Sequence, residues 1–307
     1  MKNKFIFQII FSVAFFALVL KIFLSETQTV QSLESAFSRS SIVLLFLLVA
    51  LNVSVSYLFF IIIQKISLRK FNFIAIINTF LQGGIVNQLI PGSGLIYKYF
   101  KFNSEQKISI AHYSTAQTIF YVERILAYII LAVFFGFLTI SLNTNLIFLI
   151  TLIFTFILII IYKKRKNIYS LTKTVIKKND KLKNLINDFS KVNLSIRENY
   201  LFFFLIFFLF LLQAILECLI FTQIFEIYNY SINFNISSFL WITTSLVTIL
   251  SFINFFGFFE IVFAYSSTLF DEKFIDIVII VFTYRILNLI SQIVVIVSNT
   301  ILLKFKK

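Results

Sequence analysis

The stretch NQLIPGSGLIYKYF, residues 87–100, interrupts a long apolar sequence and decides how the chain is expected to fold. It contains the only proline of the chain and two of its six glycines. Proline removes a backbone hydrogen-bond donor and glycine tolerates unusual backbone dihedral angles, so both interrupt a helix readily. The stretch therefore predicts a break in the backbone inside an otherwise apolar segment.

The rest of the chain has the composition of a membrane protein. It has 307 residues, of which 60% are hydrophobic, and its mean hydropathy is +0.97. Several apolar runs exceed the roughly 18 residues that mark a helix able to span a bilayer. A soluble domain could not bury so much apolar surface. The sequence predicts an all-α polytopic membrane protein with a single integral domain over residues 1–307.

The charges lie between the apolar runs, where they act as topology signals. The net charge of +14 would suit a nucleic-acid partner, but this placement argues against one. Basic residues at both ends predict that both termini are cytoplasmic in a multi-pass protein of the cell (inner) membrane. About six segments are then predicted to span the membrane: 5–24, 41–63, 112–140, 146–162, 200–226 and 275–303.

Two further apolar segments, 72–97 and 237–270, do not fit a simple crossing. The first starts and ends beside basic, cytoplasmic residues, and the second starts and ends on the outer side. We therefore predict two re-entrant hairpins that enter from opposite faces, with ordinary kinks in spanning helices as the alternative. The glycines and the proline expected to form the hairpins are Gly83, Gly84, Pro91, Gly92, Gly94 and Gly257.

The order of segments repeats with reversed orientation. Repeat A covers about 41–140 and repeat B about 200–303, and each is a spanning segment, a hairpin and a second spanning segment. Arg124-Ile125-Leu126 in the first repeat resembles Arg285-Ile286-Leu287 in the second. The pattern predicts an inverted repeat of the kind found in many transporters. Between the repeats lies a cytoplasmic basic loop at 163–199, with eleven basic and three acidic residues, which either rests on anionic lipid or marks topology alone.

Charged residues inside apolar segments are candidates for a functional site. Glu123, Arg124, Glu217, Glu260 and Arg285 each lie well within one. A charge at the bilayer centre costs roughly 2.5–3.5 kcal/mol, so these side chains are expected to face the interior of the protein. From the repeat we predict that Arg124 pairs with Glu260 and Glu123 with Arg285, either around a substrate or simply as links between helices.

Other polar residues have simpler expected roles. Lys98 has no evident acidic partner, and either meets a phosphate headgroup or extends to the interface. Gln213 and Glu217, and in the other repeat Asn52 and Ser56, share helix faces and are expected to hydrogen-bond between helices.

These motifs together resemble the flippase-like family that includes the transmembrane region of lysylphosphatidylglycerol synthase. The resemblance covers nearly the whole chain and depends on the order of four short motifs. They are Pro91-Gly92-Ser93-Gly94 with Lys98, then Val122-Glu123-Arg124, then Gly257-Phe258-Phe259-Glu260, then Tyr284-Arg285. The family's best-known members add a soluble aminoacyl-transferring domain. The chain holds no soluble segment of that size, so the resemblance does not imply synthase activity.

The resemblance and the charges together predict a lipid flippase or translocase that moves an anionic phospholipid or a polyprenyl-phosphate-linked lipid between leaflets. The expected substrate-binding residues are Lys98, Glu123, Arg124, Glu260 and Arg285. We expect no catalytic residue, metal, cofactor or nucleic acid, and an anionic membrane lipid as partner, with a homo-oligomer or an envelope-biosynthesis partner as further possibilities. The alternatives are a membrane-embedded transferase acting on a lipid headgroup, and a non-transporting subunit of envelope lipid or glycan machinery.

Overall fold

The computed structural model describes residues 39–89, 93–139, 199–228, 230–251, 258–267 and 274–305. Within these ranges the chain forms eight α-helices and no β-strand, which confirms the all-helical prediction. The predicted spans 5–24 and 146–162 lie outside the described residues, as does nearly all of the basic loop. The same holds for Pro91, Gly92 and Gly257.

Four long helices match four of the six predicted spans. They are α3 (Arg39–Ser67), α6 (Ile110–Thr139), α9 (Tyr200–Ile227) and α12 (Phe274–Phe305). Each contains at least 26 consecutive residues of high hydropathy, more than the roughly 20 that cross the hydrocarbon core of a bilayer. The chain is therefore a membrane protein with several transmembrane helices.

Each of the two predicted hairpin regions folds as a pair of short helices. The first pair is α4 (Phe73–Leu89) with α5 (Ser93–Gln106), and the second is α10 (Phe234–Ser251) with α11 (Phe258–Ser267). α4 and α10 begin alike, because Asn72 and Asn233 each accept a backbone N–H of the first turn on the side-chain oxygen, as N-cap residues do.

The helices α4 and α5 run antiparallel and touch closely. Ser93 Oγ donates to the carbonyl of Val86 at 3.3 Å, and one turn farther along, Tyr97 donates to Gln82 at 3.0 Å. The second arm continues to Gln106, beyond the predicted end of the hairpin at residue 97. The lysines of α5 therefore belong to the hairpin itself and do not mark its end.

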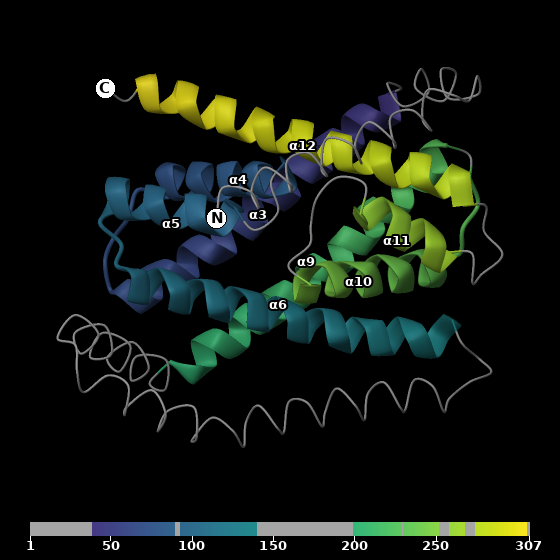
Figure 1. The fold of residues 1–307 in the computed structure, drawn as a ribbon, viewed down its shortest axis with the longest axis horizontal. Helices are drawn as coiled ribbons and strands as arrows, with labels where there is room; N and C mark the ends of the chain where they lie inside the picture. The colour runs from purple at the N-terminus through teal and green to yellow at the C-terminus, as the bar shows by residue number, and fades with distance from the viewer. Residues whose placement is uncertain are drawn as a thin grey trace, which may run out of the picture.

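The two halves of the described chain repeat both in helix order and in packing. A long helix, two short helices and a second long helix form each half, α3 to α6 and α9 to α12. When α3, α4, α5 and α6 are exchanged for α9, α10, α11 and α12, every substantial helix contact maps onto another one: α4–α12 onto α10–α6, for example, and α3–α12 onto α9–α6. Figure 1 shows the two short pairs on opposite sides of the molecule, between α12 and α6.

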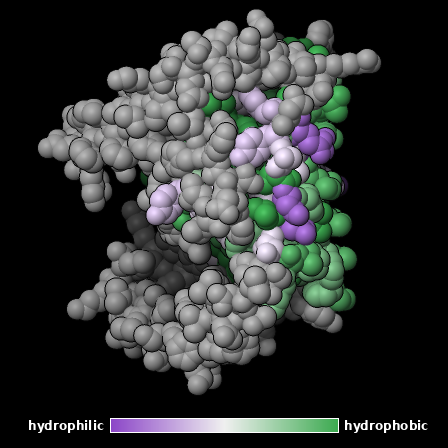
Figure 2. Space-filling model, turned by 90° about the vertical axis from the view of Figure 1, so that its right-hand side faces the viewer, coloured by the Kyte–Doolittle hydropathy of each residue, from purple (hydrophilic) through white to green (hydrophobic). Residues whose placement is uncertain are grey.

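The long helix α9 shows how the molecule divides its apolar residues between core and lipid. One side packs inward through Phe210, Phe221 and Phe225, all almost completely buried. The other side exposes a continuous row, Leu201, Phe204, Leu205, Phe208, Leu209, Leu212, Ile215, Leu216 and Leu219. A helix that is apolar all round suits a lipid-facing position. In Figure 2 the described surface at one end of the molecule is likewise mostly hydrophobic, with a few hydrophilic residues gathered together.

Phenylalanine rings join the first half to α9. The ring of Phe59 packs on Phe80 at a centroid distance of 5.0 Å, Phe80 packs on Phe120 at 5.4 Å, and Phe120 packs on Phe210 at 5.1 Å. These rings come from α3, α4, α6 and α9, and their edge-to-face and tilted arrangements are the favourable ones for aromatic pairs. Phenylalanines therefore form part of the core as well as part of the exposed apolar surface of α9.

Candidate functional site

A polar cavity of about 260 Å³ lies where the two short helix pairs approach each other. Each of the eight described helices contributes to its lining. The charged residues in that lining are Lys98, Arg124, Glu217 and Arg285. Three of the five predicted substrate-binding residues therefore meet in one space, although α12 lies far from α5 and α6 in the sequence.

Lys98 is the most unusual of these residues. Its side chain is buried, with 7% exposed, and its ammonium lies 4.0 Å from the centroid of the Phe80 ring. Among the described residues its ammonium meets no carboxylate within 4.0 Å and no hydrogen-bond acceptor. The alternative that Lys98 extends to the interface is wrong for this conformation, because the side chain turns into the protein.

Arg124 forms an ion pair with Glu217 of α9, with 2.9 Å between Nη2 and Oε1, and not with Glu260 as predicted. The same carboxylate accepts hydrogen bonds from the Tyr128 hydroxyl and, at 2.9 Å, from Gln213 Nε2. The predicted interhelical role of Glu217 is confirmed. The rotation of α6 about its axis explains the difference, because Arg124 lies on the side of α6 that packs against α9.

The guanidinium of Arg124 is only partly used by this network. Nε and Nη2 donate to Tyr128 and Glu217, whereas Nη1 has no hydrogen-bond partner among the described residues. The side chain keeps 24% of its surface exposed and lines the cavity. Arg124 can therefore hold Glu217 and still present donors to a ligand.

Arg285 pairs with Glu260 at 3.5 Å, within the second half, and this corrects the predicted pairing of Arg285 with Glu123. Both side chains are buried, at 8% and 0% exposed, and the guanidinium also stacks over Phe259. Glu260 is the third residue of α11, so this pair fixes the start of α11 against α12. Glu260 lies behind Arg285, which itself reaches the cavity.

Glu123 does not join the site. It is partly buried, is not among the residues that line the cavity, and makes no ion pair within the described residues. Adjacent residues of a helix project about 100° apart, so Arg124 can face the cavity while its neighbour Glu123 does not. The structure thus separates the two members of the Glu-Arg motif.

The contact between α3 and α12 corresponds to the contact between α9 and α6 in the other half. Neutral polar residues connect α3 to α12, whereas Glu217 connects α9 to α6. Asn52 Nδ2 donates to Asn288 Oδ1 and to Ser291 Oγ, each at 2.7 Å. The predicted interhelical role of Asn52 is confirmed. That of Ser56 is wrong, because its hydroxyl donates back to the carbonyl of Asn52 within α3.

The three described glycines of the first pair, Gly83, Gly84 and Gly94, lie inside helices. A Cβ on Gly83 would stand 2.6 Å from Cε of Lys98, and one on Gly94 would stand 2.6 Å from Cβ of Asn87 and would collide with the carbonyl oxygen of Gly83. Gly84 is less restricted, since its nearest neighbour would be Gln292 Oε1 at 3.5 Å. Gly83 therefore gives Lys98 the room to lie along α4.

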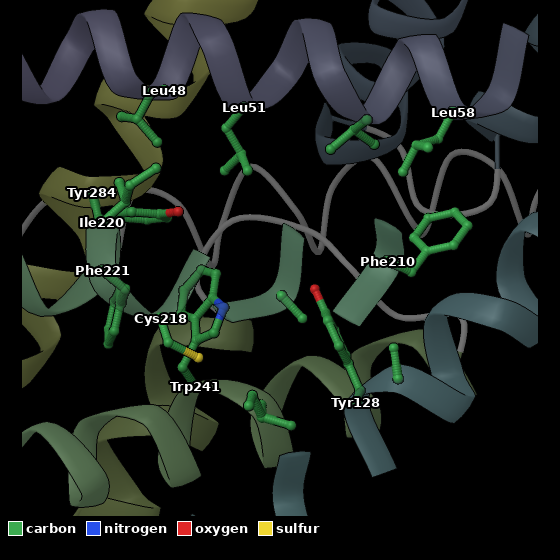
Figure 3. Packing of buried hydrophobic residues seen from close by; sticks show 14 of the residues in the cluster. Leu48, Leu51, Leu58, Tyr128, Phe210, Cys218, Ile220, Phe221, Trp241 and Tyr284 are labelled. Atoms are coloured by element: carbon green, nitrogen blue, oxygen red, sulfur yellow. The ribbon is translucent and has the colours of Figure 1, made fainter. Parts of the chain in front are cut away.

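Trp241, the only tryptophan of the chain, is a cavity residue that sequence reasoning missed. Its ring stacks on Phe221 at 4.3 Å, and its indole nitrogen is buried without a hydrogen-bond partner in the described part of the chain. Figure 3 shows leucines of α3 pointing toward Trp241 and Tyr128, with Tyr284 near Phe221. A lone tryptophan among many phenylalanines was the available signal.

The cavity has no metal-ligating cluster in the described ranges, where no three His, Cys, Asp or Glu side chains are grouped. Cys218 is a free, buried thiol. What the arrangement offers is a set of hydrogen-bond donors with one buried cation in excess, and such a set can bind an anion. Comparison of the chain with protein-family models, with curated proteins and with solved structures finds no match.

Proposed function

We propose that the protein is a lipid translocase that moves an anionic phospholipid or polyprenyl-phosphate-linked lipid between the two leaflets of a membrane. One observation carries the proposal: Lys98 is a buried lysine with no anionic partner among the described residues, and it faces a cavity between two short helix pairs. Burial without a partner disfavours the charged ammonium, so an anion that enters the cavity would stabilise the charged form there.

The cavity suits a headgroup rather than a whole lipid. Its volume of about 260 Å³ is smaller than the roughly 300–1,000 Å³ of pockets for drug-sized ligands. Lys98 and Nη1 of Arg124 would face the phosphate, and the acyl chains would stay among the exposed apolar side chains of the long helices. Binding only the headgroup keeps the costly part of the lipid out of hydrocarbon during transfer.

The repetition of helix order and contacts supports alternating access. We infer that α4–α5 and α10–α11 are re-entrant pairs that enter from opposite faces, because one arm of each pair is too short to span: α5 has 14 residues and α11 has 10, against the roughly 17–25 of a spanning helix. Two halves related in this way form an inverted repeat, and rocking one against the other would expose the central cavity to each face in turn. The resemblance to the flippase-like family points to the same function.

The test is a headgroup-accessibility assay in proteoliposomes with a fluorescently labelled anionic phospholipid and an impermeant quencher. Wild-type protein should make nearly all of the label accessible. Lys98→Gln should reduce the rate of translocation at least tenfold, because the phosphate loses its main cation. A tenfold loss corresponds to about 1.4 kcal/mol in the barrier. Lys101→Gln is the matched control: Lys101 lies one turn along α5 but bonds Gln82 and Glu105 outside the cavity.

Two outcomes would contradict the proposal. One is label in the inner leaflet that stays protected in wild-type vesicles. The other is accessibility that is equal in wild type and Lys98→Gln. If labelled donor groups were instead transferred to the lipid headgroup, the protein would be the membrane-embedded transferase.

A further inference from the structure

One constant separation in the sequence relates the two halves residue by residue. It joins the first residues of α3 and α9, the first residues of α4 and α10, their N-cap residues, the last residues of α5 and α11, and the two cavity arginines. These pairs are Arg39 with Tyr200, Phe73 with Phe234, Asn72 with Asn233, Gln106 with Ser267, and Arg124 with Arg285. Because the helix contacts of the halves also correspond, this separation assigns each residue of one half a counterpart in the other.

The counterparts differ in character along one contact. α4 packs on α12, and its equivalent α10 packs on α6 (Figure 1). Four polar residues of α4 and α12 have apolar counterparts in α10 and α6. The pairs are Asn78 with Phe239, Asn288 with Ala127, Gln292 with Leu131, and Asn299 with Leu138. α10 and α6 are also packed together more extensively, and Phe135 lies edge-on against Phe234 at 5.7 Å.

The polar residues of α12 extend from the cavity toward the end of the helix. Asn288, Gln292 and Asn299, spaced i, i+4 and i+11, lie on one face of α12. The first two line the cavity and bond Asn52 of α3, at 2.7 and 3.4 Å. Farther out, Asn299 Nδ2 donates to Asn78 Oδ1 of α4 at 3.0 Å. Polar bonds between membrane helices average about 0.6 kcal/mol, so this one can open at little cost.

Basic residues stand at the outer end of the same contact. Arg69 and Lys70 are exposed just before α4 begins, and Asn78 lies less than two turns into that helix. The counterparts of the two basic residues, before α10, are the uncharged Tyr230 and Ser231. Exposed basic residues at a membrane surface attract anionic lipid by about 1 kcal/mol each. An anionic headgroup is therefore attracted to the outer end of α4–α12, and not to the equivalent end of α10–α6.

We propose, on the basis of the translocase function above, that the lipid headgroup enters the cavity between α4 and α12, from the leaflet at which Arg69 and Lys70 lie. Asn78 and Asn299 exchange their mutual hydrogen bond for bonds to the headgroup as it passes. The headgroup then reaches Lys98, while the acyl chains stay against the exposed apolar side chains of α12. The contact between α10 and α6 stays closed in this conformation.

Substitutions at the outer hydrogen bond separate a route from a simple link between helices. In the proteoliposome assay above, Asn78→Leu and Asn299→Leu should each slow translocation at least tenfold. Asn78→Ser and Asn299→Ser keep a polar group but lose the bond between the helices, and should stay within about twofold of wild type. A residue that only links helices would be harmed equally by both changes. Leu138→Ala, at the counterpart position in α6, is the control and should have little effect.

A second measurement uses exposed positions whose substitution does not disturb packing. Ser298 of α12 and its counterpart Phe137 of α6 are both exposed. In a Cys218→Ala background, Ser298→Cys and Phe137→Cys each carry a thiol-linked benzophenone, in vesicles of equal phosphatidylglycerol and phosphatidylcholine. After illumination, position 298 should have captured phosphatidylglycerol at least threefold in excess of phosphatidylcholine, and position 137 the two lipids about equally.

The outcomes distinguish this inference from the proposed function. If leucine and serine at positions 78 and 299 slow translocation equally, or if position 137 captures as much phosphatidylglycerol as position 298, the route between α4 and α12 is overturned. Translocation that still depends on Lys98 would then leave the translocase standing. If wild-type protein translocates no anionic lipid, or Lys98→Gln does not change the rate, the translocase is overturned and the route with it.

Discussion

The Glu217 carboxylate is surrounded by donors from two helices, and its removal tests how the site is held together. Arg124→Gln leaves this buried carboxylate without its counter-ion, and Glu217→Gln leaves the guanidinium without its own. Breaking one side of a buried ion pair typically costs about 3–5 kcal/mol, whereas replacing both charges is often nearly neutral. Each single variant should therefore lower the thermal midpoint in detergent markedly, and the double variant should recover most of the loss.

A matched pair of charges controls for general effects of mutation. Lys101 and Glu105 form an exposed i, i+4 pair at 3.7 Å, which should contribute less than about 1 kcal/mol. Lys101→Gln and Glu105→Gln should leave the midpoint almost unchanged. If Arg124→Gln were equally harmless, the ion pair with Glu217 would not be part of the stable structure.

Individual residues show where sequence reasoning reaches its limit. That Arg124, Arg285 and Lys98 turn inward follows from the cost of a charge in lipid, and the structure places all three at one cavity. Which carboxylate each arginine meets depends on the rotation of α6 and α12 about their axes, and the apolar sequence around them does not set that rotation. That Trp241 faces the cavity depends likewise on the rotation of α10.

At the scale of the elements, the packing of α4 against α5 gives a prediction with an internal control. Gly83→Ala and Gly94→Ala would each drive a methyl group into a neighbouring helix, and overpacking of this kind costs typically 1–3 kcal/mol. Gly84→Ala meets only ordinary contact at 3.5 Å and should be neutral or slightly stabilising. Thermal unfolding of the three variants in detergent checks this order.

Gly83→Ala should also have a functional effect that Gly94→Ala lacks. The added methyl group displaces the methylene chain of Lys98, so anionic-lipid binding should fall with Gly83→Ala even at temperatures where the protein is folded. A Gly84→Ala variant that is less stable than Gly83→Ala would show that the two helices are packed differently.

Element boundaries were the part that sequence predicted best. The four described long helices begin and end within about four residues of the predicted spans, because long apolar runs bounded by charges leave little choice. The predicted hairpin at 72–97 is too short, because α5 continues past Lys98 and Lys101 to Gln106. A lysine commonly marks the end of a lipid-facing helix, but Lys98 does not end α5, because its side chain turns toward a polar cavity.

At the scale of the whole molecule, the proposed inverted repeat predicts which side of the membrane each half reaches. Cys218 is the only cysteine and is buried, so Cys218→Ala gives a background free of thiols. Ser104→Cys, at the exposed end of α5, should react with an impermeant maleimide from the cytoplasmic side. Ser231→Cys, exposed before α10, should react only from the other side.

Intact cells and inverted membrane vesicles provide the two sides for this labelling. Reaction of both positions from the same side would rule out an inverted repeat, even though the helix contacts of the two halves correspond. Positions 104 and 231 are suitable because each adjoins a short helix without lining the cavity.

The two buried ion pairs have different places relative to the halves. Arg285–Glu260 lies inside the second half, whereas Arg124–Glu217 joins α6 of the first to α9 of the second. Under the proposed function, a phosphate bound at Nη1 of Arg124 shares the charge of the guanidinium with Glu217 and so weakens a link between the halves. An empty protein would then stay in its resting state because its own carboxylate occupies the arginine, and cargo arrival would itself permit the motion that carries it, which limits idle cycling and ion leakage.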